Sequence, residues 1–236
     1  MDQEEVAFLF RQRDLISAPV VDADGRLVGV ITIDDIVDVI DEEHQEDIMS
    51  MAGVSEGDTL FAAVADTIRS RFKWLALYTV CAFGSASVIS LFRGSITEMV
   101  ALAVLMPIVA AMGGTASVQT LTVAVRAIAM KELTPANALR NVGKELVVAL
   151  INGVVFAIVI GAIAWFWFGN PLLSFVIGFA LILNLLVAGV YGSTLPVILQ
   201  RFGYDPAAAA SAFATAITDI VGFFVFLGLG TLLLLR

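Results

Sequence analysis

The sequence predicts an all-α, multi-pass membrane protein with five membrane-spanning helices, preceded by a small α+β fragment. Of its 236 residues, 59% are hydrophobic, and the mean hydropathy is +0.95. Charge is concentrated at one end, because residues 1–73 carry 17 acidic and 6 basic side chains whereas residues 74–236 carry 5 and 7. A soluble domain is about 45–50% apolar, so the second region is too apolar for water.

Long stretches with almost no charge locate the expected spans. Three of them hold no charge and the fourth holds only Asp219; they are residues 74–92, 99–125, 146–200 and 206–235. A span needs about 20 apolar residues, so residues 146–200 are long enough for two. Gly169, Asn170 and Pro171 divide that stretch, because glycine favours helix ends and proline favours helix starts. Five spans are therefore expected.

The distribution of basic residues predicts the orientation in the membrane. In a five-span topology Arg93 and Arg236 fall on one side. Eight basic residues fall on the other side: Arg69, Arg71, Lys73, Arg126, Lys131, Arg140, Lys144 and Arg201. Because positive loops stay inside, we expect a cytoplasmic N-terminus in a plasma (inner) membrane, with lipid around the spans.

Asp219, in the fifth expected span, is the strongest functional signal. A charge at the bilayer centre costs at least about 2.5–3.5 kcal/mol, so Asp219 should face the protein interior or water. Ser211, Thr215, Thr218 and Gly222 recur with it at helical spacing, which predicts one polar stripe. Its oxygens suit a hard cation. The alternative is that these small residues only let helices pack closely, with Asp219 protonated or hydrogen-bonded.

The second expected span carries breaker residues at membrane depth. Pro107 removes a backbone donor, and Gly113 and Gly114, followed by Thr115, loosen the next turn. Broken helices often mark transport sites, although an ordinary packing kink has the same residues. A similar but weaker irregularity is expected in the fourth span at Asn184, Gly189, Gly192, Ser193, Thr194 and Pro196.

The N-terminal region reads as strand, turn, strand and helix after a short helix at residues 3–13. Thr32 fits the N-cap of the second helix, with Asp35 in its first turn. Further on, Glu43, Glu46 and Asp47 share one helical face. That face is either a solvated acidic surface or a low-affinity sensor for divalent cations on the cytoplasmic side.

A break at residues 53–58 precedes an expected amphipathic helix at residues 59–73, which Asp58 can cap. No Walker A sequence, kinase or hydrolase signature, or His/Cys cluster is visible in the sequence. The chain is therefore not expected to be an enzyme. The basic residues flank the membrane, so nucleic acid is not an expected partner.

Three segments carry a family resemblance. The segment APVVDADGRLVGVITIDD resembles the second half of a cystathionine-β-synthase (CBS) domain. The segments PIVAAMGGTASVQTLTVAVRAIA and YDPAAAASAFATAITDIVGFFVF resemble the transmembrane domain of the MgtE family of magnesium channels. The expected domains are a partial CBS domain with the acidic helix (1–50), a connecting or plug helix (51–73) and the five-helix transmembrane domain (74–236).

The resemblance implies a homodimer with a pore on its two-fold axis, in which Asp219 binds largely hydrated Mg²⁺ and Ser211 and Thr215 line the pore. It implies that the connecting helix plugs the cytoplasmic mouth. The acidic residues of the preceding helix would hold regulatory Mg²⁺, so that high internal Mg²⁺ closes the channel. Thr32 and Asp35 match positions that contact a nucleotide ribose. Thr115 stands where asparagine is common, and the family's N-terminal domain and first CBS domain are missing.

The sequence thus predicts passive, Mg²⁺-gated transport of magnesium or a similar divalent cation, driven by potential and concentration. Two alternatives remain at this point. The first is a secondary transporter that exchanges a divalent cation for Na⁺ or H⁺ through the same aspartate. The second is a membrane anchor or regulator that moves no ion.

Overall fold

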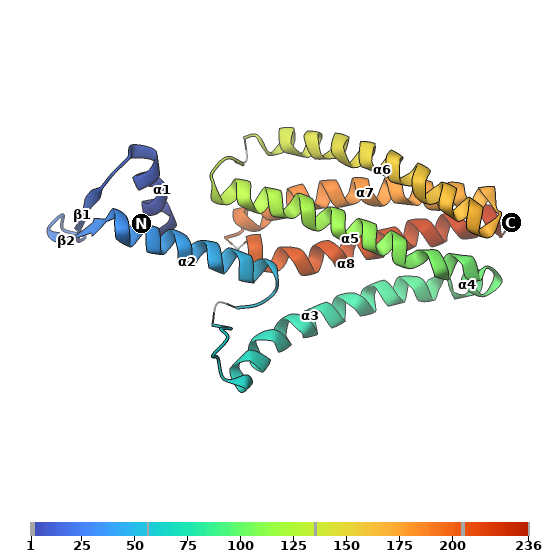
Figure 1. Cartoon of the computed structure of the whole chain (residues 1–236), viewed down its shortest axis with the longest axis horizontal. Coiled ribbons are helices and arrows are strands. Elements are labelled where there is room, and N and C mark those ends of the chain that lie inside the picture. The colour runs from blue at the N-terminus through green and yellow to red at the C-terminus, as the bar shows by residue number, and fades with distance from the viewer. Residues whose placement is uncertain (1–2, 56, 135, 204–205, 236) are drawn as a thin grey trace.

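The computed structural model describes residues 3–55, 57–134, 136–203 and 206–235, with only the backbone described for residues 208–212. The elements follow in the order α1 (Gln3–Arg13), β1 (Ser17–Val21), β2 (Leu27–Thr32), α2 (Ile33–Met51), α3 (Val64–Leu91), α4 (Arg93–Glu98), α5 (Val100–Ala129), α6 (Ala138–Phe168), α7 (Pro171–Arg201) and α8 (Pro206–Leu234). The long helices run along the longest axis of the molecule, and the N-terminal elements project from one end (Figure 1). We call this the fragment end.

The N-terminal fragment has the expected strand, turn, strand and helix. β1 and β2 pair antiparallel, with a register shift between Val20 and Val21. The turn between them is closed by Asp22, whose Oδ1 accepts hydrogen bonds from the backbone N–H groups of Asp24 and Arg26. Only a small core, centred on Phe10 and Ile36, packs α1 onto α2. Such a small core stabilises the fragment little by itself.

The segment between α2 and α3 differs from the expectation. The helix expected from residue 59 begins at Val64, and it continues without a break into the first membrane span. Asp58 does not cap it; instead its carboxylate accepts a hydrogen bond from Arg71 Nε at 2.7 Å. Leu60 and Phe61 lie before the helix and are 98% and 97% exposed. Asp58 therefore ties the preceding loop to the second turn of α3.

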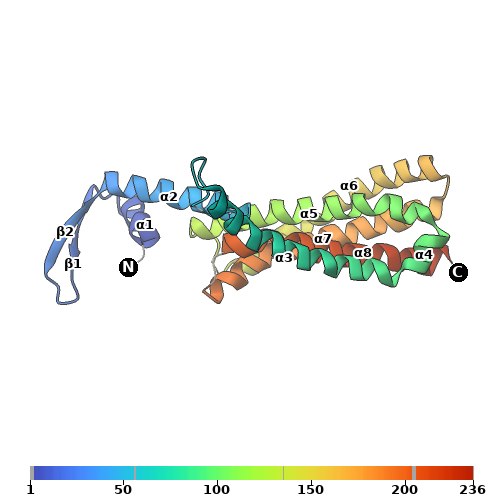
Figure 2. The ribbon, with the colours of Figure 1, turned by 90° about the horizontal axis from the view of Figure 1, so that it is seen from below.

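The bundle is built around α7. This helix contacts α5, α6 and α8, and its buried side chains form much of the main core. α3 packs on α8 near α4 and diverges from the bundle toward the fragment end (Figure 1). After a turn of 90° about the horizontal axis, α3 is seen to cross in front of the bundle (Figure 2). Most α3 side chains are therefore exposed on the single chain.

The division between the third and fourth spans is confirmed. Gly169 ends α6 with a positive φ of 66°, a conformation that glycine adopts readily. Asn170 caps α7 by accepting hydrogen bonds from the N–H groups of Leu172 and Leu173 at 3.0 and 3.1 Å. Pro171 starts the helix, where its missing N–H is not needed.

Five of the described helices are long and apolar enough to cross a membrane. They are Val64–Leu91, Val100–Ala129, Ala138–Phe168, Pro171–Arg201 and Phe213–Leu234. Close contacts between α6 and α7 use small residues, since a Cβ on Gly153 would lie 3.1 Å from Ile182 Cα and one on Gly178 would lie 3.3 Å from the Ala157 carbonyl oxygen. Helices in lipid associate through such close packing.

Candidate cation site between helices α5 and α8

An open groove runs between α5 and α8. Its walls are small and polar side chains: Ala110, Ala111, Gly114, Thr115, Val118 and Gln119 from α5, and Thr215 and Asp219 from α8. The two walls approach closely at Gly114, where an added Cβ would lie 3.4 Å from Thr215 Cγ2. The fold therefore places Gly114 and Thr115 of the second span beside Thr215 and Asp219 of the fifth.

Asp219 supplies the charge of this groove. Its Oδ1 is buried and has no hydrogen-bond partner among the described residues. A buried polar atom without a partner costs about 1–3 kcal/mol, and more when it is charged. A cation, or the water shell of a cation, would supply the missing interaction. The carboxylate is thus placed to attract a positive ion into a groove whose lining is mostly apolar, with the Thr115 and Thr215 hydroxyls and the Gln119 amide as its other polar side-chain groups.

The expected polar stripe of α8 divides into two faces. Thr215 and Asp219 face the groove. Thr218 is fully buried, and its hydroxyl donates to the carbonyl oxygens of Ala214 and Thr215, both at 3.0 Å. Successive residues on a helix point about 100° apart, so Thr218 and Asp219 cannot share a direction. The side chain of Ser211 lies outside those that the structure describes.

Two of the expected site glycines also face away from the groove. A Cβ on Gly113 of α5, or on Gly222 of α8, would collide with the side-chain amide of Asn184 on α7. Sequence reasoning treated Asn184 only as part of an irregular fourth span. The sequence feature that could have identified Asn184 is an amide within an apolar helix, because a buried amide must find a hydrogen-bond partner.

Pro107 does not interrupt α5. The helix continues from Val100 to Ala129 with the proline and both glycines inside it. The expected break in this helix is therefore not present, and α5 contacts both α7 and α8. Neighbouring helices commonly hold such residues in a helical path within membranes.

Glu145 is a second buried carboxylate that sequence reasoning missed. The expected third span began after it, whereas α6 begins at Ala138 and carries it into the bundle. Its Oε2 accepts a hydrogen bond from the Thr120 hydroxyl of α5 at 3.3 Å, and its Oε1 lies 3.8 Å from Lys144 Nζ. Its position directly before a long apolar stretch was the available signal.

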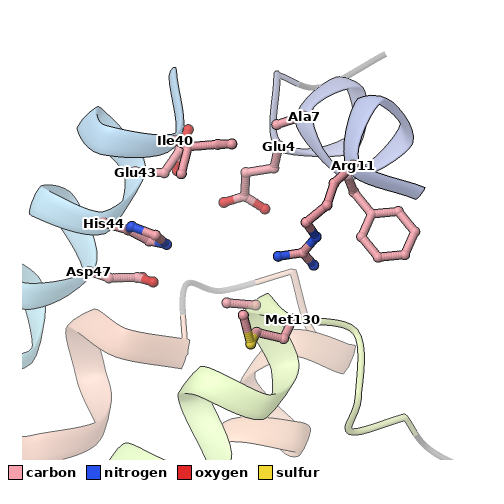
Figure 3. A pocket seen from close by; sticks show the side chains of 10 residues that line it. Glu4, Ala7, Arg11, Ile40, Glu43, His44, Asp47 and Met130 are labelled. Atoms are coloured by element: carbon pink, nitrogen blue, oxygen red, sulfur yellow. The ribbon is translucent and has the colours of Figure 1, made fainter. Parts of the chain in front are cut away.

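The acidic face of α2 borders a different pocket, at the fragment end. Glu43 and Asp47 line it with His44 of the same helix, and α1 and the end of α5 complete it. Figure 3 shows the Arg11 guanidinium and the Glu4 carboxylate of α1 across this pocket. The remaining lining residues are Ala7, Phe8, Ile40, Ala129 and Met130.

Glu43 of this pocket already has a hydrogen-bond partner. Gln3 Nε2 donates a hydrogen bond to Glu43 Oε1 at 2.8 Å, and Arg11 adds positive charge. Glu46 is not among the lining residues. Among the described residues, no group of three or more His, Cys, Asp or Glu side chains is placed to hold a metal ion. The α2 residues are thus not gathered into a cation cage in this arrangement.

Thr32 and Asp35 serve the fold locally. The Asp35 carboxylate accepts hydrogen bonds from the Thr32 N–H at 2.8 Å and from the Thr32 hydroxyl at 2.7 Å. These bonds, led by the backbone one, hold the pKa of Asp35 below its usual value. The expected N-cap at Thr32 is confirmed. Capping accounts for the Thr-x-x-Asp spacing without a nucleotide.

Membrane-spanning helices around a carboxylate-bearing groove define a multi-pass membrane protein with a candidate cation site. Residues 106–229 match the MgtE family, described as divalent cation transporters, and residues 1–42 match the CBS domain family. The chain therefore belongs to the MgtE family of divalent cation transporters. This membership confirms the expectation that it is not an enzyme, and it confirms the resemblance noted from the sequence.

Named relatives match nearly the whole chain. The magnesium transporter MgtE of Bacillus subtilis is 33% identical over 230 residues, which cover 98% of this chain and 51% of that protein. The proteins of the same name from Enterococcus faecalis and Thermus thermophilus are also 33% identical, over 98% and 99% of this chain and 51% and 52% of their own lengths. The chain spans about half the length of these relatives.

Proposed function

We infer that this chain moves Mg²⁺ passively across a membrane, along a path that includes the groove between α5 and α8. The observation that carries this proposal is Asp219, whose buried Oδ1 lacks a hydrogen-bond partner among the described residues and belongs to a groove-lining side chain. The three relatives are named magnesium transporters, which supports the choice of ion.

The chemistry of the groove suits a hydrated divalent ion. Mg²⁺ loses its water reluctantly and is usually bound by one or two carboxylates together with water. Asp219 provides the carboxylate, while Thr115, Gln119 and Thr215 provide polar groups that can bond to the water shell. The proposed role of Asp219 is therefore to attract and hold the hydrated ion.

A homodimer would enclose this path. The groove is open on one side of the single chain, and a polar path must be shielded from lipid. A second copy facing the groove would close it and would place two Asp219 carboxylates around the ion. The proposed transport needs no coupled reaction, because a doubly charged ion gains about 4.6 kcal/mol from 100 mV, at about 2.3 kcal/mol per charge.

The fragment end is the proposed regulatory end, in the cytoplasm. The pocket lined by Glu43 and Asp47 is completed by Ala129 and Met130, at the end of the groove-forming helix α5. Mg²⁺ bound near these carboxylates would act on α5 through this contact if it favoured the closed arrangement. The segment of residues 51–73, whose last ten residues form the start of α3, is the proposed link to the gate.

The test is Mg²⁺ flux into proteoliposomes that contain the intact chain. The comparison is Asp219→Asn against Glu98→Gln, which removes an exposed carboxylate from α4 outside the groove. We expect flux to be lost in the first variant and kept in the second, with both proteins eluting at the same oligomeric size. Equal flux in all three proteins would sink Asp219 as the ion ligand. Flux that requires an opposing Na⁺ or H⁺ gradient would favour the exchanger.

A further inference from the structure

Asn184 occupies the junction of three helices directly behind the groove. It is fully buried on α7, and its Nδ2 donates a hydrogen bond to the Val109 carbonyl oxygen of α5 at 3.0 Å. Its Oδ1 is buried without a hydrogen-bond partner among the described residues. A buried amide whose oxygen has no partner is costly, so its presence in an apolar bundle calls for a specific role.

Two glycines make room for this amide. A Cβ on Gly113 of α5 would collide with Asn184 Nδ2, and a Cβ on Gly222 of α8 would lie 2.7 Å from the same atom. Real Cβ atoms do not approach other heavy atoms so closely. The amide thus fills a notch on each of the two helices that form the groove, and any larger residue at either notch would force the amide or one of the helices to move.

These notches are next to the groove residues in sequence. Gly113 precedes Gly114, which lines the groove, and Gly222 lies one turn after Asp219. A shift of α5 or α8 at the junction would therefore move the groove walls at the depth of the carboxylate. The hydrogen bond to Val109 also fixes the orientation of the amide, since the opposite orientation would bring two oxygens together.

We propose that Asn184 is a positioning residue that sets the spacing of α5 and α8, and thereby the fit of the groove to its hydrated ion. This inference rests on the proposed transport function. Asn184 does not touch the ion; it acts through the two glycine notches and the Val109 carbonyl. A purely space-filling residue at this position would need no donor, and an aliphatic side chain would fill the same volume without an unbonded oxygen.

The contact between Asn184 and Gly113 can be tested by protein stability alone, with single and double variants that change the size of both residues. The three nearest atoms to a Cβ on Gly113 all belong to the amide of Asn184, so Asn184→Ala removes each of them. We expect Gly113→Ala to lower the thermal unfolding midpoint by several degrees, and the Gly113→Ala/Asn184→Ala double variant to be more stable than Gly113→Ala alone. Gly228→Ala is the matched control, because its Cβ would lie 3.8 Å from Phe92 Cζ and should change nothing.

The positioning role is tested by selectivity in proteoliposomes. In Asn184→Leu, which keeps the branch at Cγ but replaces the amide with two larger methyl groups and so loses the donor, we expect the ratio of Ca²⁺ flux to Mg²⁺ flux to change several-fold while the oligomeric size stays the same. An unchanged ratio would reduce Asn184 to packing and overturn the proposal. A double variant that is no more stable than Gly113→Ala would show that the Asn184 amide does not fill the space beside Gly113. If the unmodified chain carries no Mg²⁺, the proposed function and the positioning role fail together, whereas the stability cycle still decides the junction.

Discussion

The two acidic regions of this molecule hold their carboxylates in opposite surroundings. On α2, Glu43 and Asp47 line an open pocket together with Arg11 and His44, and Glu43 already accepts a hydrogen bond from Gln3. On α8, Asp219 is the one carboxylate among the described groove-lining residues, and its buried Oδ1 has no partner there.

The difference teaches that surroundings, more than the number of carboxylates, determine what an acidic group can do. Two unit charges 4 Å apart interact by about 1 kcal/mol in water but by about 4 kcal/mol at an effective dielectric constant of about 20. The Glu43 and Asp47 carboxylates of α2 are half-buried in an open pocket outside the membrane spans, and they are closer to the first regime, where salt screens each charge. Asp219 is closer to the second regime. We therefore expect one substitution at Asp219 to change Mg²⁺ transport more than several substitutions on α2.

The largest effect is expected when the charge of Asp219 is removed rather than moved. Asp219→Asn should lower the initial rate of Mg²⁺ uptake at least about tenfold, since every 1.4 kcal/mol is a factor of ten. Asp219→Glu keeps the charge but displaces it by one methylene, so it should lose less. Uptake measured over a series of Mg²⁺ concentrations checks this. Equal losses in the two variants would show that the position of the carboxylate matters more than its charge.

The next effect concerns the width of the groove. Gly114→Val adds a branched side chain where a Cβ alone would lie 3.4 Å from Thr215 Cγ2, so the branches would fill the groove or separate its walls. We expect Mg²⁺ uptake to fall several-fold while the protein still folds. Gly143→Val on α6 is the control, because no atom lies within 4 Å of its added Cβ. Similar Mg²⁺ uptake in both variants would show that this groove is not part of the ion path.

A smaller effect is expected on the acidic face of α2. The double variant Glu43→Gln/Asp47→Asn should shift the internal Mg²⁺ concentration that inhibits uptake by at most about fivefold, because exposed ionic interactions contribute about 0–1 kcal/mol. Uptake at a series of internal Mg²⁺ concentrations measures the shift. A larger shift would mean that these carboxylates gather around a cation in another arrangement. The expected difference in effect between the α2 carboxylates and Asp219 would then not hold.

The smallest effect concerns the start of α2. Because the pKa of Asp35 is lowered in the folded chain, the stability it adds is present above its unfolded pKa of about 3.9 and is lost as pH falls through the lower folded value. Asp35→Ala should therefore increase amide hydrogen exchange near Thr32 at neutral pH. The difference between variant and parent should vanish at low pH, after correction for intrinsic rates. A difference that persists there would assign the effect to something other than the carboxylate.

Local patterns predicted much of the fold. The five spans follow from length and hydropathy, the Thr32 cap and the Gly169-Asn170-Pro171 turn follow from residue chemistry at helix ends, and all are present. The predicted helix start at residue 59 is wrong, because α3 begins at Val64. Asp58 looked like a cap, but it pairs with Arg71 on α3, a contact between residues 13 positions apart that a helix-end pattern does not reveal.

The sequence by itself determined that Asp219 lies in an apolar span and that polar and small residues recur around it, because spacing along one helix is a local property. Only the tertiary structure decided which of them face the groove. The rotation of α8 against α5 and α7 places Thr215 and Asp219 in the groove and directs Gly222 toward Asn184. That rotation depends on packing among three separate helices, which no pattern within a single helix specifies.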